Sequence, residues 1–157
     1  NESKTYLVEP YCVKLSGGRW YMLARSVEKG RLLLYSLDRL EHVRTTEQKF
    51  ELPRDFVAKD YFADFFGIVI DENVPLQRIV LQADKYHQYY MRTLPMHHSQ
   101  RELFSCDDYA DFELTLRPTY DFYMRLMSWG NMIKVLEPQS LQDELCKWLR
   151  KTMEVYE

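Results

Sequence analysis

The chain has 157 residues, of which 46% are hydrophobic and 15% are aromatic, so it can bury one substantial core or two small ones and is not intrinsically disordered. No apolar run approaches the roughly 18 residues that a membrane span needs, and the first four residues contain no signal-peptide core. These features predict a soluble, cytoplasmic protein that does not bind a membrane. The missing initiator methionine suggests a fragment of a longer chain.

The net charge of −3 is unevenly distributed along the chain. Residues 11–49 contain eight lysines and arginines against four acidic residues, a local net charge of +4, which leaves −7 for the rest. A basic patch of this size suits a phosphate-bearing ligand or a short nucleic-acid strand, although a solvated surface explains it equally well. The whole chain is too acidic to be a general binder of duplex DNA.

Three cysteines, Cys12, Cys106 and Cys146, are widely spaced and odd in number. A disulfide framework is therefore not expected, and a reducing compartment is. Because the cysteines are set among apolar residues, we interpret all three as small core residues.

The first half of the chain contains short runs of alternating apolar residues separated by turns. Four strands are predicted, at residues 11–15, 19–25, 31–35 and 37–45. Gly17 and Gly18 supply the positive φ angles of a tight hairpin turn. Four or five short strands cannot form a two-layer sandwich, so we expect them to close into a small barrel. After Pro53, apolar residues recur every three or four positions and predict a short helix packed on that barrel.

The second half begins after residues 71–75, which are polar, end in a proline and predict a linker between two domains, 1–70 and 75–157. The pattern that follows reads strand, helix, strand, strand, helix, strand, helix. A strand-helix-strand unit repeated twice is the ferredoxin-like arrangement. In the last helix, the apolar residues fall on one stripe, which predicts that the helix covers a sheet. These residues are Leu141, Leu145, Trp148, Leu149 and Met153.

No catalytic or metal-binding motif accompanies these elements. The only histidine pair, His97-His98, is predicted to lie in a strand, where adjacent side chains point to opposite faces, and no cysteine lies at zinc spacing from it. The Asp107-Asp108 pair with Asp111 lacks the spacing and the glycine of a calcium loop and predicts a hairpin turn. We therefore predict no metal, no cofactor and no enzyme activity.

The remaining candidates lie on the strand over residues 19–25, where alternate side chains point to opposite faces. One face carries Trp20 and Met22 and is expected to belong to the core. On the other face, Tyr21 and Arg25 can grip a phosphate or a carboxylate together while the phenol ring stacks on a base.

Arg39 is a charge between Leu37 and Leu40, in a segment predicted to be a strand. A charge at such a position is rarely buried without a partner. The sequence is equally consistent with a ligand contact and with a structural salt bridge to Glu9, Glu41 or another acid.

Six short motifs follow one another along nearly the whole chain. They are Pro10-Tyr11, Trp20-Tyr21-Met22, Leu37-Asp38-Arg39-Leu40, Phe66-Gly67-Ile68, Ser128-Trp129-Gly130 and Leu136-Glu137-Pro138. In this order they resemble the WYL domain and its C-terminal WCX extension, from a family of bacterial transcriptional regulators. The resemblance implies an α+β fold in which a small SH3-like (Sm-like) antiparallel β-barrel is followed by a ferredoxin-like α/β-sandwich extension.

The resemblance also implies a ligand site, because family members are thought to bind nucleotides or single-stranded nucleic acid through a tyrosine and arginines of the barrel. The corresponding residues here are Tyr11, Tyr21 and Arg39. The family often has arginine where this chain has Leu33 and Ser36. The basic residues that can substitute are Lys14, Arg25 and Arg31. Alternation would bury Tyr11 together with Val13 unless a β-bulge near Pro10 turns it outward.

The leading hypothesis is the ligand-sensing region of a transcriptional regulator. A nucleotide or a short single-stranded nucleic acid on the barrel would control an upstream winged helix-turn-helix domain, and duplex DNA would be bound only through that domain. Because two basic contacts are missing, a small anionic ligand is a rival. The alternative is a dimerisation or protein-interaction module without a small ligand, and a homodimer is expected. An enzyme acting on a nucleotide is the third hypothesis.

Overall fold

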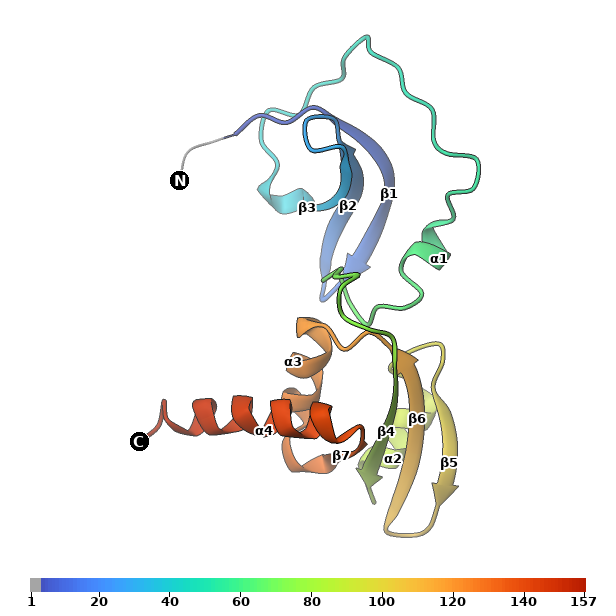
Figure 1. Ribbon diagram of the computed structural model, residues 1–157, viewed down its shortest axis with the longest axis vertical. Coiled ribbons are helices and arrows are strands. Elements are labelled where there is room, and N and C mark those ends of the chain that lie inside the picture. Colours follow the sequence, from blue (N-terminus) through green and yellow to red (C-terminus); the bar gives the residue numbers. More distant parts are fainter. Residues whose placement is uncertain (1–3) are drawn as a thin grey trace. The chain divides into compact units, whose positions relative to one another are not determined.

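The computed structural model describes residues 4–157, which form two compact units. The first unit ends at Tyr61, and the second runs from Phe62 to Glu157. Each contains one antiparallel sheet together with helices, so the predicted α+β class is confirmed (Figure 1). Among the described residues, no helix is long and apolar enough to cross a membrane. The predicted domain limits, 1–70 and 75–157, stay a prediction.

The first unit is built on a three-stranded sheet, with β1 (Val8–Ser16), β2 (Arg19–Ser26) and β3 (Arg31–Ser36) in the order β1-β2-β3. Both neighbouring pairs are antiparallel. Gly17 and Gly18 connect β1 to β2 with φ angles of +56° and +76°, because a two-residue hairpin turn of this kind needs the left-handed region. β2 is the central strand, so its side chains have neighbours on both sides.

The fourth strand predicted over residues 37–45 is wrong. Leu37–Arg39 forms a 3₁₀ turn, η1, and the chain has neither helix nor strand over residues 40–57. The Asp38 carboxylate accepts a hydrogen bond from the Ser36 hydroxyl, a local contact that competes with pairing in a sheet. With three strands the sheet does not close, so the SH3-like barrel is not confirmed.

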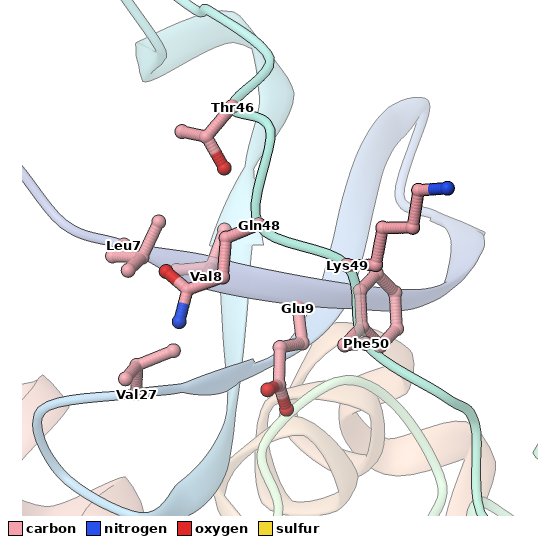
Figure 2. A pocket seen from close by; sticks show the side chains of 8 residues that line it. All are labelled: Leu7, Val8, Glu9, Val27, Thr46, Gln48, Lys49 and Phe50. Atoms are coloured by element: carbon pink, nitrogen blue, oxygen red, sulfur yellow. The ribbon is translucent and has the colours of Figure 1, made fainter.

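The short helix predicted after the first sheet is present as a single turn, α1 (Ala58–Tyr61). Just before it, Phe56 contacts Tyr11 of β1 edge to face, with the ring centroids 4.9 Å apart. Residues 46–50 run alongside β1 and line a small pocket with it (Figure 2). These contacts attach the irregular segment over residues 40–57 to the sheet.

The buried part of the first unit is small. Leu23, Ala24 and Ser26 of β2 are almost fully buried, but Trp20, which is expected in the core, is 52% exposed. Trp20 lies at the hairpin end of the sheet, opposite Leu15, which is exposed as well. A core position for Trp20 requires a closed barrel, and without a fourth strand this end of the sheet has no second layer.

The second unit has a four-stranded antiparallel sheet in the order β5-β6-β4-β7. Its elements are β4 (Gln77–Asp84), α2 (His87–Thr93), β5 (Arg101–Ser105), β6 (Tyr109–Leu116), α3 (Tyr120–Trp129), η2 (Gly130–Met132), β7 (Ile133–Glu137) and α4 (Gln139–Met153). Because α2 connects β4 to β5 and α3 connects β6 to β7, the strand order and the crossovers are those of a ferredoxin-like sheet. The arrangement predicted for this half is therefore confirmed.

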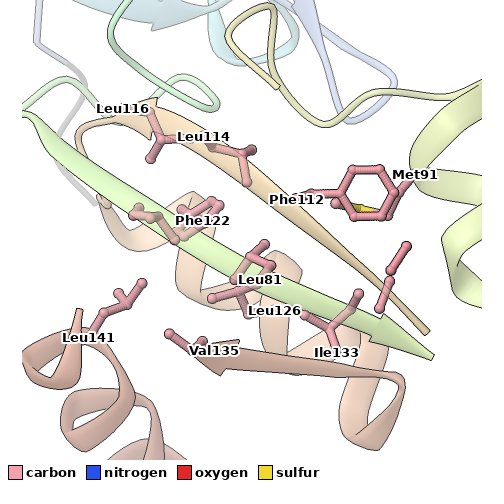
Figure 3. Packing of buried hydrophobic residues seen from close by; sticks show 13 residues of the cluster. Leu81, Met91, Phe112, Leu114, Leu116, Phe122, Leu126, Ile133, Val135 and Leu141 are labelled. Carbon is pink, nitrogen blue, oxygen red and sulfur yellow. The ribbon is translucent and has the colours of Figure 1, made fainter. Parts of the chain in front are cut away.

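The core of the second unit lies between one face of the sheet and the helices. Leu81 of β4 is opposite Phe112 of β6, and both are fully buried. Figure 3 shows Leu81 near Phe122 and Leu126 of α3, and Phe112 near Met91 of α2. Apolar residues recur at alternate positions along both strands, so these side chains lie on the same face; Val80 of β4, which is also buried, lies on the opposite face.

The final helix, α4, covers the sheet with its first half only. Leu141 is buried and Leu145 packs against the core. Leu149 is 41% exposed and Met153 is 61% exposed, so the predicted covering role is wrong for the second half of the stripe. α4 contacts β7 and α3, and its last turns extend away from them (Figure 1).

Candidate ligand-binding site

Lys14 and Tyr21, two of the predicted ligand residues, lie side by side on the sheet of the first unit. Tyr21 on β2 is directly opposite Lys14 on β1 and Ser36 on β3. Side chains that are opposite each other in an antiparallel sheet point to the same face and are within reach of each other. Tyr21 is half-buried, so part of the residue stays accessible.

The turn η1 packs against β2 and brings further charges to this part of the sheet. Arg19 of β2 forms an ion pair with Asp38, at a nitrogen-oxygen distance of 3.4 Å. The hydrogen bond from the Ser36 hydroxyl holds the pKa of Asp38 below its ordinary value. The positive charges of Arg19 and Arg39 act on this pKa in the same direction. Asp38 is therefore an ionised partner of Arg19 on β2.

Arg39 is exposed, and it forms no ion pair with any residue that the structure describes. The salt bridge to Glu9 or Glu41, the alternative to a ligand role, is thus not found within residues 4–157. Glu9 pairs with Arg25 instead, with 3.1 Å between Oε2 and Nη1. The guanidinium of Arg39 is left accessible to an anionic ligand.

Arg25 lies too far from Tyr21 for the two to hold one phosphate together. Both side chains point to the same face of β2, as predicted, but they are four positions apart along the strand, about 13 Å at roughly 3.3 Å per residue. Arg25 is also partly neutralised by its ion pair with Glu9. A ligand that contacts both has to be longer than a single phosphate group.

Tyr11 occupies a β-bulge. The pairing of β1 with β2 changes register between Pro10 and Cys12, so Tyr11 is the extra residue and has no partner on β2. The bulge that would turn Tyr11 away from the core is therefore present. The ring is half-buried and packs against Phe56.

Only one of the two arginine positions that depart from the family pattern belongs to this face. Ser36 is opposite Tyr21, so an arginine there would stand beside the ring. Leu33 is opposite Ala24, on the other face of the sheet. Arg31 shares that other face and therefore cannot substitute at the Tyr21 side.

The pocket between β1 and the irregular segment is not predicted by the sequence analysis (Figure 2). Its volume is about 30 Å³, enough for a water molecule and too small for a nucleotide. It is lined by Leu7, Val8, Glu9, Val27, Thr46, Gln48, Lys49 and Phe50. Residues 46–50 show no periodic pattern, so no signal in the sequence could have put them beside β1.

In the part of the chain that the structure describes, neither a metal-binding cluster nor a disulfide is found. No group of three histidine, cysteine, aspartate or glutamate residues there can hold a metal ion. His97 and His98 lie in a turn rather than in the predicted strand, and their ring centroids are 4.2 Å apart.

The three cysteines are free. Cys106 in the β5–β6 turn and Cys146 on α4 are exposed and Cys12 is half-buried, so their prediction as core residues is wrong.

Known domain families match both halves of the chain. The model of the WYL domain matches residues 1–45, and that of the WCX domain matches residues 75–153. The solved structure of the proteasome accessory factor B/C (PafBC) of Arthrobacter aurescens is similar over 88% of this chain, with 22% identity and a TM-score of 0.36. This chain spans only 21% of that one. No curated protein matches the sequence significantly. With its WYL domain followed by a WCX domain, the chain belongs to the family of WYL domain-containing regulators.

Proposed function

We propose that this chain is the ligand-sensing region of a bacterial transcriptional regulator. Its first unit, called the WYL unit below because it contains the WYL domain, binds a nucleotide or a short single-stranded nucleic acid. The observation that carries the proposal is the pairing of Tyr21 with Lys14, beside an η1 turn that carries the exposed Arg39. An aromatic ring near two cations suits a base that is attached to a phosphate. Membership of the family supports the regulatory role.

The length of the site favours a short strand over a single nucleotide. The cations at the Tyr21 end of the sheet are on β1, on β2 at Arg19 and on η1, while Arg25 and Tyr11 lie farther along the sheet. A mononucleotide would use only the Tyr21 end. An oligonucleotide would also reach Arg25, where a phosphate would replace the carboxylate of Glu9.

Titrations with labelled hexathymidylate and with single nucleotides, followed by fluorescence anisotropy and calorimetry, test the proposal. Tyr21→Ala removes the stacking ring, and Arg39→Ala removes a cation that forms no ion pair with any residue that the structure describes. Each should weaken oligonucleotide binding by about 5- to 150-fold, the equivalent of about 1–3 kcal/mol. Arg31→Ala, on the opposite face, is the matched control and should leave the affinity unchanged.

Two results would rule out the ligand assignment: no binding of any of these ligands, or equal binding by the wild type and the two variants. A third result would redirect it. If Arg39→Ala weakens binding and Tyr21→Ala does not, the ligand is a small anion that uses the cations without stacking on the ring.

We propose that DNA is bound by an upstream winged helix-turn-helix domain in the cytoplasm. A ligand bound to the WYL unit would control the position of that domain. Reading the residues encoded before Asn1 tests this part of the proposal. A winged-helix pattern there supports it, and an unrelated domain would contradict it.

A second candidate function, a dimerisation module, is favoured by α4. The second half of this helix exposes Leu149 and Met153 on one stripe. Arg150 and Lys151 in its last turn are basic, and Glu154, the residue that follows the helix, is acidic. Two such helices in antiparallel orientation would bring opposite charges together, so a homodimer through α4 is compatible with ligand sensing.

A further inference from the structure

The chain that follows α1 belongs to the second unit, called the WCX unit below because it contains the WCX domain. Phe65 is buried and forms an isolated parallel bridge with Arg117, just after β6. The backbone N–H of Arg117 donates to the carbonyl oxygen of Asp64 at 2.7 Å, and its Nε lies 3.6 Å from the Asp64 carboxylate. Residues 64–69, which we call the strap, therefore pack on the WCX unit.

Asp121, in the first turn of α3, holds the far end of the strap. Its Oδ2 accepts hydrogen bonds from the backbone N–H groups of Ile68, at 2.6 Å, and Val69, at 2.9 Å. Two charge-assisted bonds to one carboxylate oxygen make a strong anchor. Gly67 leaves room for the carboxylate, because a Cβ atom at this position would overlap it.

The segment before the strap touches the proposed ligand site. Phe56 packs on Tyr11, with the ring planes inclined at 76°. Residues 46–50 line the pocket together with Glu9, whose carboxylate pairs with Arg25. The irregular segment thus contacts one predicted ligand residue directly and the ion-pair partner of another.

We infer that Phe56 is an internal competitor for the ligand on the ring of Tyr11, carried on a segment whose far end is fixed to the WCX unit. The inference rests on the proposed function. A base that stacks on Tyr11 has to displace Phe56, while the strap keeps its place on the WCX unit. Residues 57–63 take up the movement, so ligand binding changes the local conformation of these residues.

The competition predicts a gain in affinity. Phe56→Leu removes the competing ring and should tighten binding of hexathymidylate by about three- to tenfold, the range expected for one aromatic contact. Phe50→Leu is the matched control, because Phe50 belongs to the same irregular segment but lines the pocket, and it should leave the affinity unchanged. Thermal melts of both variants check that they fold.

Hydrogen exchange of the whole chain provides the second measurement. The amide of Phe56 donates to Pro53, and the amides of Asp60 and Tyr61 in α1 donate to Val57; saturating hexathymidylate should speed the exchange of all three severalfold. Ile68 and Val69 should stay protected by Asp121.

The outcomes separate the two claims. Binding without faster exchange at Phe56, or an affinity of Phe56→Leu equal to or weaker than that of the wild type, overturns the competition and leaves the proposed function standing. A flat titration for the wild type and for Phe56→Leu alike overturns the proposed function, and the competition with it.

Discussion

Gly67 and Asp121 are a matched pair at the residue scale. The Asp121 carboxylate occupies the volume that a side chain at position 67 would need, and from there it reaches the amides of Ile68 and Val69. Gly67→Ala should lower the free energy of unfolding by about 1–3 kcal/mol, because the carboxylate has to give up hydrogen bonds to avoid the added methyl group. Denaturant unfolding measures this change.

The control for Gly67→Ala is the same substitution in an Asp121→Ala background. The carboxylate is then absent, so the added methyl group should lower the free energy of unfolding much less. The effects of the two substitutions on this free energy should be non-additive by at least about 0.5 kcal/mol. Additive effects would show that the overlap is not the reason for a glycine at this position.

His87 is a buried histidine packed against aromatic rings. It lies edge to face with Trp129, at a centroid distance of 4.4 Å, and stacks on Tyr90. Its Nε2 has no hydrogen-bond partner among the residues described. Burial lowers the pKa of His87 below its ordinary value of 6.5, and the negative charge of Asp84 opposes this shift.

This lowered pKa predicts a loss of stability on acidification. Above pH 6.5 the imidazole is neutral in both states; below it, the unfolded chain takes up a proton that the folded protein binds less readily. The loss grows by at most about 1.4 kcal/mol per pH unit until the pH reaches the pKa of the folded state. In denaturant unfolding at pH 7.5 and 5.5, His87→Phe should lose less stability than the wild type. Equal losses would contradict the assignment to His87.

At the scale of elements, β2 organises the WYL unit because it is the strand with a neighbour on each side. A slip of one residue in its pairing would turn Tyr21 to the opposite face, away from Lys14 and Ser36. The two-glycine turn and the bulge at Tyr11 hold the register. The proposed site therefore depends on strand register more than on any single contact.

The second half of α4 gives the prediction that belongs to this scale. An uncovered amphipathic face is typical of an interaction surface. Met153→Lys introduces a charge into the apolar stripe and should shift sedimentation from dimer toward monomer, with little change in thermal stability because the side chain is exposed. Leu76→Lys changes an exposed leucine outside α4 and should leave the dimer intact. A dimer that Met153→Lys does not affect, or a wild type that is monomeric at every concentration, would contradict dimerisation through α4.

At the scale of the whole molecule, the two units differ in charge. Up to Tyr61 the sequence contains eleven basic and nine acidic residues, a net charge of +2. From Phe62 onward it contains ten basic and fifteen acidic residues, a net charge of −5. The unit with the proposed site is therefore the one that attracts phosphate, and the acidic WCX unit is a poor surface for nucleic acid.

Helices and strands with a strong local sequence pattern could be predicted. Segments whose conformation depends on contacts with other parts of the chain could not. Alternation along β4 and β6 marks the strands of the second sheet, and two glycines mark the first hairpin. Residues 37–45 also look like a strand. The first three of these residues form η1 instead, where Asp38 accepts a hydrogen bond from Ser36 and pairs with Arg19, and a pattern of apolar residues contains no information on such contacts.

The sequence by itself determined the α+β class, the ferredoxin-like order of the second half, the family, and the face of β2 on which Tyr21 lies. These depend on periodicity, turn residues and short motifs, all of which are local along the chain. Only the tertiary structure decided that Glu9 pairs with Arg25 rather than Arg39, and that Phe56 packs on Tyr11. The partners in these contacts are far apart in sequence and meet only once the sheet has formed, so their choice depends on distances that no local pattern encodes.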